Sequence, residues 1–218
     1  DRTFAAGLGV NTRWLGWGVG VLDLEQDGWP DLFLVNGHVY PEVETLSSEA
    51  GYAQRKVVYR NRGTGRFDDV TDRLGPPVTT PAASRGAAFG DIDNDGDVDV
   101  VVNNMHAPPD LFRLDTGDAA GHWLSVALVG TISHRNAIGA RVTISAGGRT
   151  FVDEVRGGGS YFAQNDFRLH FWLGTATRVD PIVVRWMTGH EEAFAIDGVD
   201  RLVTLTEGRG RRVPGPAR

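Results

Sequence analysis

The sequence predicts an all-β protein with two domains. Glycine makes up 29 of the 218 residues, and the apolar residues occur in short runs separated by turn residues. Both features favour many strands joined by tight turns. The chain is long enough to bury a sizeable core, and no apolar run approaches the ~20 residues that a membrane-spanning helix needs. Cysteine is absent, which excludes disulfides and thiolate metal sites.

An internal repeat lies in the first predicted domain, residues 1–118. The segment WGVGVLDLEQDGWPDLFLVNGH (17–38) aligns without a gap with RGAAFGDIDNDGDVDVVVNNMH (85–106). A looser echo links VVYRNRGTG (57–65) with DLFRLDTGD (110–118). Each copy places an acidic turn between short apolar runs that are typical of buried strands. The repeat therefore indicates one strand–loop–strand unit used twice.

The two acidic turns predict metal loops. Carboxylates on alternate residues converge on one point when the chain turns back at a glycine, here Gly28 or Gly96, and their repulsion is relieved by a divalent cation. Many carboxylates in a flexible loop favour Ca²⁺ over Mg²⁺, so we expect two calcium sites. The predicted ligands are Asp23, Glu25, Asp27, the Trp29 carbonyl and Asp31 in the first loop, and Asp91, Asp93, Asp95, the Asp97 carbonyl and Asp99 in the second.

Two alternatives compete with this interpretation. An EF-hand shares the D-x-D-x-D-G start but needs a glutamate at position 12, where this chain has Leu34 and Val102. An acidic turn without a metal is disfavoured because two copies carry Gly and Asp in the same phase. We expect a structural role for the ions, since all ligands of a site come from one loop and no nucleophile or general base accompanies them.

The charge distribution supports two acidic sites on an otherwise balanced surface. Nine of the 28 acidic residues lie in 23–31 and 91–99. The other 19 are balanced in number by the 22 Lys and Arg residues of the chain. The basic tail, 209–218, is predicted to be disordered. No basic patch with interleaved aromatic residues indicates nucleic-acid binding.

The second predicted domain, residues 119–208, has the pattern of a β-sandwich. Seven short apolar runs alternate with turn signals such as Gly147-Gly148 and Thr188-Gly189. The runs in 140–146 and 201–207 alternate as half-buried antiparallel strands do. A small, polar segment at 114–122 marks the domain boundary. The predicted strands are 122–130, 140–146, 149–155, 168–174, 181–187, 191–196 and 201–207.

These stretches resemble two known families. GWGVGVLDLEQDGWPDLF and RGAAFGDIDNDGDVDVVV resemble FG-GAP (VCBS, integrin-α-type) repeats, and this resemblance implies calcium-stabilised β-propeller blades. HWLSVALVGTISHRNAIGARVTISAGGR, EVRGGGSYFAQNDFRLHFWLG and RVDPIVVRWMTG resemble the ASPIC/UnbV domain that follows such repeats in cartilage acidic protein and its bacterial relatives. Closed propellers use about 4–8 blades, so we expect either the C-terminal part of a longer protein or other chains that complete the ring.

Two functional classes follow from the sequence. The first is a non-enzymatic, extracytoplasmic calcium-binding module for a protein or glycan partner, since millimolar calcium outside the cytoplasm suits weak sites. The second is an accessory or catalytic component of a biosynthetic pathway, which the UnbV resemblance implies; a subunit of a large complex is a third possibility. A pocket that gathers His134, Arg135, Arg156 and Asp166 would favour the second class.

Overall fold

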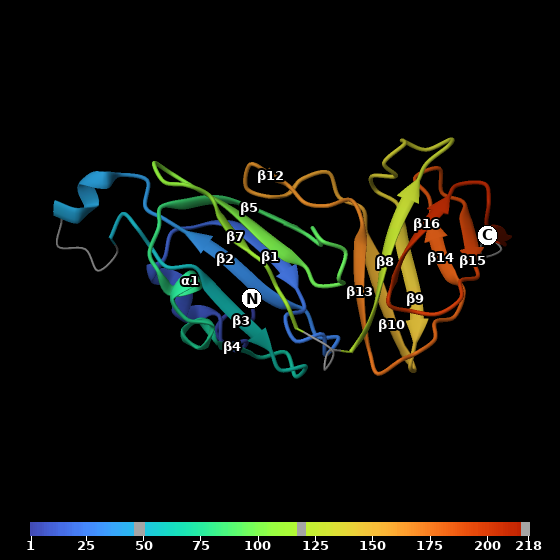
Figure 1. Ribbon diagram of the computed structural model, residues 1–218, viewed down its shortest axis with the longest axis horizontal. Helices are drawn as coiled ribbons and strands as arrows, with labels where there is room; N and C mark the ends of the chain where they lie inside the picture. Colours follow the sequence, from blue (N-terminus) through green and yellow to red (C-terminus); the bar gives the residue numbers. More distant parts are fainter. Residues whose placement is uncertain (46–50, 117–120, 215–218) are drawn as a thin grey trace.

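The computed structural model describes residues 1–45, 51–116 and 121–214 and confirms the all-β prediction. Two lobes lie side by side along the long axis, with β1 to β7 in the first domain and β8 to β17 in the second (Figure 1). No helix of the described part is long and apolar enough to cross a membrane. The helices are η1 (Gly9–Arg13), η2 (Pro41–Thr45), η3 (Thr71–Leu74) and α1 (Pro76–Thr79).

The first domain contains two antiparallel sheets that repeat one plan. Each starts with a hairpin around an acidic loop, and the pairs Leu22–Asp31 and Gly90–Asp99 close the two loops at equivalent places. This confirms the predicted strand–loop–strand unit and is consistent with two propeller blades in an open arrangement. The first sheet has the order β1 (Gly16–Leu22), β2 (Asp31–Asn36), β3 (Val57–Asn61), β4 (Phe67–Asp69), and the second β5 (Ser84–Gly90), β6 (Asp99–Asn104), β7 (Asp110–Phe112).

Close contact between β1 and β5 joins the two sheets. A Cβ on Gly18 would lie 2.8 Å from the backbone nitrogen of Ala87, so only glycine permits this approach. The aromatic rings of Phe33 and Phe89 meet edge to face across the same core, with centroids 6.1 Å apart. The blades are therefore packed as one unit.

The second domain is a two-sheet sandwich over a single core. Both sheets contribute buried side chains, among them Leu124 from one sheet and Ile144 and Val184 from the other. All seven predicted strands are present. One sheet has the order β10 (Arg149–Glu154), β9 (Arg141–Ala146), β14 (Ile182–Arg185), β15 (Glu191–Phe194), β17 (Arg211–Val213), and the other β13 (Leu169–Gly174), β8 (His122–Val129), β16 (Arg201–Thr206).

Two details of the second domain correct the sequence predictions. The strand β16 pairs with β8 in parallel, not antiparallel, because the preceding strand β15 belongs to the opposite sheet and the chain crosses over before β16 begins. The tail predicted to be disordered contributes β17, whose residues pair with β15. The last part of that tail, 215–218, lies outside the described residues, as does 117–120 within the predicted boundary. The two hydrophobic cores lie on either side of that boundary.

A small hairpin of the second domain reaches across the first. Its strands are β11 (Gly159–Ser160) and β12 (Ala163–Gln164), and they lie against β1 and β5. The Asp166 N–H donates to the carbonyl of Phe89 (2.9 Å), and the Phe89 N–H donates to the side-chain oxygen of Asn165 (3.2 Å). This hairpin docks the sandwich onto the blades.

Candidate metal centres

The first carboxylate of each acidic loop is buried and holds the loop closed. Asp23 accepts the N–H of Gly28, and Asp91 accepts the N–H of Gly96 (3.1 Å). Both aspartates are almost fully buried. The carboxylate at position 1 therefore stabilises the turn from the inside of the loop, where a cation can neutralise its charge.

The last carboxylate ties each loop to a third strand of its sheet. Asp31 accepts the N–H of Asn61 at the end of β3 (2.7 Å), and Asp99 accepts the N–H of Leu114 just after β7 (2.9 Å). Asp31 and Asp99 are also buried. The predicted ligands at positions 1 and 9 therefore lie inside the fold, and the two loops share one construction.

Each loop contains two residues in the left-handed backbone region. At position 6, Gly28 has φ +82° and Gly96 has φ +98°, as the glycine signature predicted. At position 4, Gln26 has φ +54° and Asn94 has φ +64°. The second left-handed residue was not predicted, because Gln carries no strong preference for that region.

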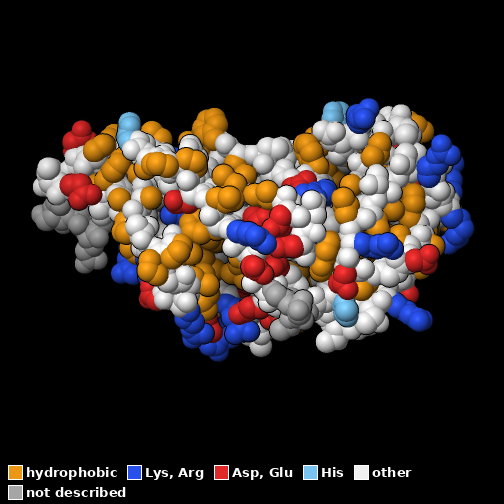
Figure 2. Space-filling model, viewed as in Figure 1, with side chains coloured by type: hydrophobic (Ala, Val, Ile, Leu, Met, Phe, Trp, Pro, Cys, Tyr) orange, Lys and Arg blue, Asp and Glu red, His pale blue; other side chains and the backbone are white. Residues whose placement is uncertain are grey.

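The carboxylates at positions 3 and 5 are partly exposed, and in each loop an arginine lies beside them. The Nε of Arg60 lies 2.7 Å from Glu25, and the Nε of Arg113 lies 2.8 Å from Asp93. Each guanidinium also lies near the carboxylate at position 5, at 4.0 Å in the first loop and 3.6 Å in the second. Acidic and basic side chains gather near the middle of one face of the molecule (Figure 2).

These two arginines were not predicted as part of the loops. Arg60 and Arg113 occupy the same place in the echoing segments VVYRNRGTG and DLFRLDTGD, which is the signal that could have found them. Each supplies a positive charge to carboxylates that are predicted to bind a cation. An arriving ion must therefore compete with an arginine that is already present.

The second loop fits a divalent cation better than the first. One carboxylate oxygen each from Asp91, Asp93 and Asp99 lies within 4.8 Å of the others, and an all-oxygen donor set suits a hard cation. Across the described ranges, no other group of three acidic or histidine side chains meets the same distance limit. The first loop forms no such group among the described residues, and its position 3 carries the longer side chain of Glu25, which is paired with Arg60.

Burial makes the loop carboxylates costly to ionise without a cation. It raises the pKa of Asp23 to about 7 and that of Asp31 to about 6, although N–H donors partly offset the shift. Burial also raises the pKa values of Asp91 and Asp99. A bound cation would offset this penalty.

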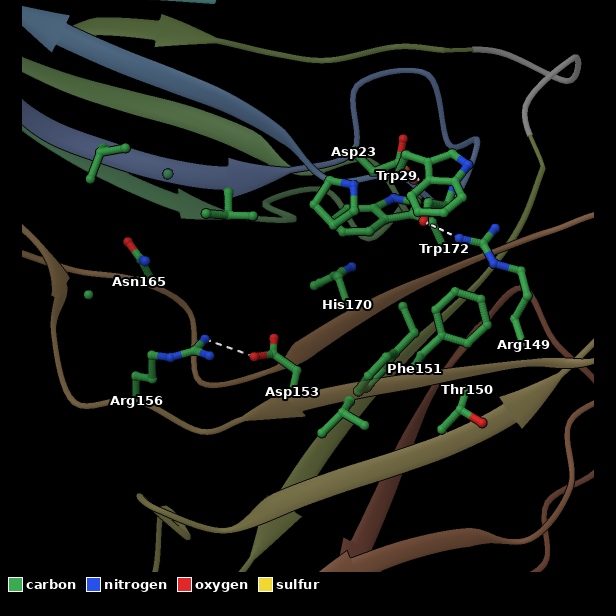
Figure 3. A pocket seen from close by; sticks show the side chains of 18 residues that line it. Asp23, Trp29, Arg149, Thr150, Phe151, Asp153, Arg156, Asn165, His170 and Trp172 are labelled. Carbon is green, nitrogen blue, oxygen red and sulfur yellow. Dashed lines mark hydrogen bonds and ion pairs between the residues drawn. The ribbon is translucent and has the colours of Figure 1, made fainter. Parts of the chain in front are cut away.

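A pocket of about 580 Å³ lies between the two domains (Figure 3). Its volume falls within the range of small-molecule sites. At its floor, burial lowers the pKa of His170 to about 4, so the imidazole is neutral at pH 7. His170 Nδ1 and Trp172 Nε1 are buried and have no hydrogen-bond partner among the residues that the structure describes. Side chains that line the pocket include Trp29, Arg149, Phe151, Asp153, His170 and Trp172.

The residues proposed to mark an active site do not converge in this pocket. Arg156 lines it, and both Arg156 and Asp166 line a smaller adjoining pocket of about 120 Å³. His134 and Arg135 line neither of them. Arg156 is held by Asp153 at 2.8 Å. Only two of the four residues, Arg156 and Asp166, therefore share a pocket.

Comparison with known proteins supports the two predicted resemblances. The family model for the FG-GAP-like repeat matches residues 36–102, which include the second acidic loop, and the model for ASPIC and UnbV matches residues 130–212. No curated protein is significantly similar to the chain. Together with the all-β fold, these two matches support an FG-GAP repeat protein with an ASPIC and UnbV domain.

Proposed function

We propose that this protein is a non-enzymatic, calcium-dependent interaction module that works outside the cytoplasm. The observation that carries the proposal is the convergence of Asp91, Asp93 and Asp99 in a loop whose construction is repeated at 23–31. Calcium concentrations outside the cytoplasm match the weak affinity typical of extracellular sites. In this proposal the ions hold the loops closed, and no reaction step involves them.

The partner in this proposal is a protein or a glycan. The two blade sheets are open, and FG-GAP repeats are associated with interaction rather than with a single chemistry. On the outer strand β7, the side chain of Leu111 is exposed. Open sheet edges of this kind can pair with another chain, which would place further blades or a partner beside these two.

Calorimetric titration of chelator-treated protein with Ca²⁺ tests the metal part of the proposal. The Asp93→Asn variant should lose binding at the second loop and remain folded, because the Asp93 side chain is partly exposed and accepts no backbone N–H among the described residues. Glu154→Gln on β10, an exposed acidic residue outside both loops, is the matched control. Absence of heat at millimolar Ca²⁺ in the unmodified protein would reject the proposal.

The interdomain pocket favours a second candidate, an accessory component of a biosynthetic pathway. It combines aromatic walls with the unpartnered nitrogens of His170 and Trp172, as small-molecule sites do. Mass spectrometry of small molecules released from the natively purified protein would test this candidate. Release of one stoichiometric compound would favour it, and release of none would leave the interaction module as the better proposal.

A further inference from the structure

We propose that the second domain completes the calcium loops of the first, with Arg149 and Arg168 as positioning residues for one loop each. The inference rests on the calcium binding proposed above and adds its dependence on the docked sandwich. Calcium affinity would then depend on domain docking, and calcium would strengthen docking in return. Two separate sets of contacts, one at each loop, support the inference.

Arg149 reaches the first loop from strand β10. It donates from Nη2 to the carbonyl of Gly28 (2.5 Å) and from Nη1 to the carbonyl of Asp27 (3.3 Å). Figure 3 shows its guanidinium group reaching toward the loop from the far side of the pocket. The group lies 4.8 Å from the Trp29 ring and 5.0 Å from the Phe151 ring. These contacts hold the backbone at the predicted ligand Asp27 and at Gly28, which are positions 5 and 6 of the loop.

Arg168 reaches the second loop from the segment before β13. Its Nη1 donates to the side-chain oxygen of Asn94 (2.5 Å), and its Nη2 donates to the carbonyl of Asp91. Asp166 holds the same guanidinium at its Nε. The side chain of Arg168 is only 22% exposed, so the contact is part of the interface rather than a surface ion pair. It fixes positions 1 and 4 of the loop.

The glycine at position 6 admits the second domain at both loops. A Cβ on Gly28 would lie 2.3 Å from Arg149, and a Cβ on Gly96 would lie 2.2 Å from the indole of Trp123. Arg149 and Trp123 come from different sheets of the sandwich. Two unrelated parts of the second domain therefore pack on equivalent points of the repeat. This agreement indicates that the loops form part of the docking surface of the sandwich, beside the hairpin contacts with β1 and β5.

The sign of the effect separates positioning from simple electrostatics. A guanidinium group near a cation site repels the cation, so its removal should tighten calcium binding if charge alone matters. If the arginine instead holds the loop backbone in the closed turn, its removal should weaken binding despite the lost repulsion. Linkage then requires calcium to favour docking by the same factor.

Calcium titrations of the full chain test the inference. We expect Arg149→Met and Arg168→Met to weaken one site each, on the order of tenfold, since each removes charge-assisted hydrogen bonds from a loop. Arg141→Met on β9, an exposed arginine with no ion pair among the described residues, should leave both sites unchanged. Calcium should also slow hydrogen exchange in the hairpin 159–164, and this protection should shrink in both arginine variants.

The outcomes distinguish this inference from the proposed function. If the unmodified chain binds no calcium, the proposed function itself fails. If it binds calcium but the arginine variants bind equally or more tightly, the positioning role is refuted and the calcium sites stand. Arg168→Lys keeps the charge and loses the paired donors, so weakened binding supports positioning and unchanged binding refutes it. This milder variant decides the question if Arg168→Met does not fold.

Discussion

Replacement of Arg113 by Met should raise the calcium affinity of the second loop. The guanidinium Nε of Arg113 lies 2.8 Å from Asp93, and its Nη2 lies 3.6 Å from the carboxylate of Asp95. Both carboxylates are predicted ligands, so an ion that binds them must displace this intramolecular cation. Met keeps the apolar stem of the side chain and removes the competing charge.

The expected gain is small because the pair is partly exposed. The Arg113 side chain is 60% exposed, and solvent-exposed ion pairs contribute roughly 0.2–1 kcal/mol. A release of about 0.7 kcal/mol corresponds to about a threefold tighter site, since 1.4 kcal/mol is tenfold. The difference should shrink at high salt, where exposed charges are screened.

Competition with a fluorescent chelator at low and at high salt measures this affinity. Arg62→Met is the control: Arg62 is 57% exposed and pairs with Asp68 at 2.6 Å, outside both loops, so its loss should not change the site. An unchanged or weaker affinity in Arg113→Met would show that the arginine does not compete with the ion. The expected direction is opposite to that for Arg168, which contacts the loop backbone instead.

Three further predictions concern stability. Chelation should lower the melting temperature, because an ion at 100 times its Kd stabilises the fold by about 2.7 kcal/mol per site, and a scan with and without chelator measures the difference. Gly96→Ala should lower the melting temperature more than Gly208→Ala: both glycines have positive φ, but a Cβ on Gly96 meets Trp123, whereas a Cβ on Gly208 meets nothing within 4 Å. An equal loss would argue against tight packing at the loop. Burial alone would raise the pKa of Glu207, but N–H donors of residues 131–133 outweigh it and lower the pKa to about 2. The carboxylate therefore stabilises the fold above pH 4.5 and loses this effect as the pH falls toward 2. Denaturant unfolding should thus show a Glu207→Gln deficit at pH 7 that closes in acid, and a constant deficit would contradict the assignment.

Much of the fold could be predicted because its signals are local. Short apolar runs between turn residues identified the strands of the sandwich, and the repeat identified a strand–loop–strand unit. The parallel pairing of β16 and the strand β17 were missed. A run of apolar residues predicts that a strand forms. The neighbouring strand with which it pairs depends on how the other strands are arranged in the two sheets.

The positions of the acidic loops could be predicted from the residues alone, because alternating carboxylates and a glycine at position 6 specify a turn through short-range sterics and charge. The surroundings of each loop, in contrast, depend on how the chain packs in three dimensions. Arg113 approaches from the residue that follows the third strand of the same sheet, and Arg149 and Arg168 approach from another domain. Such contacts follow from sheet twist and domain docking, which depend on the packing of the whole chain.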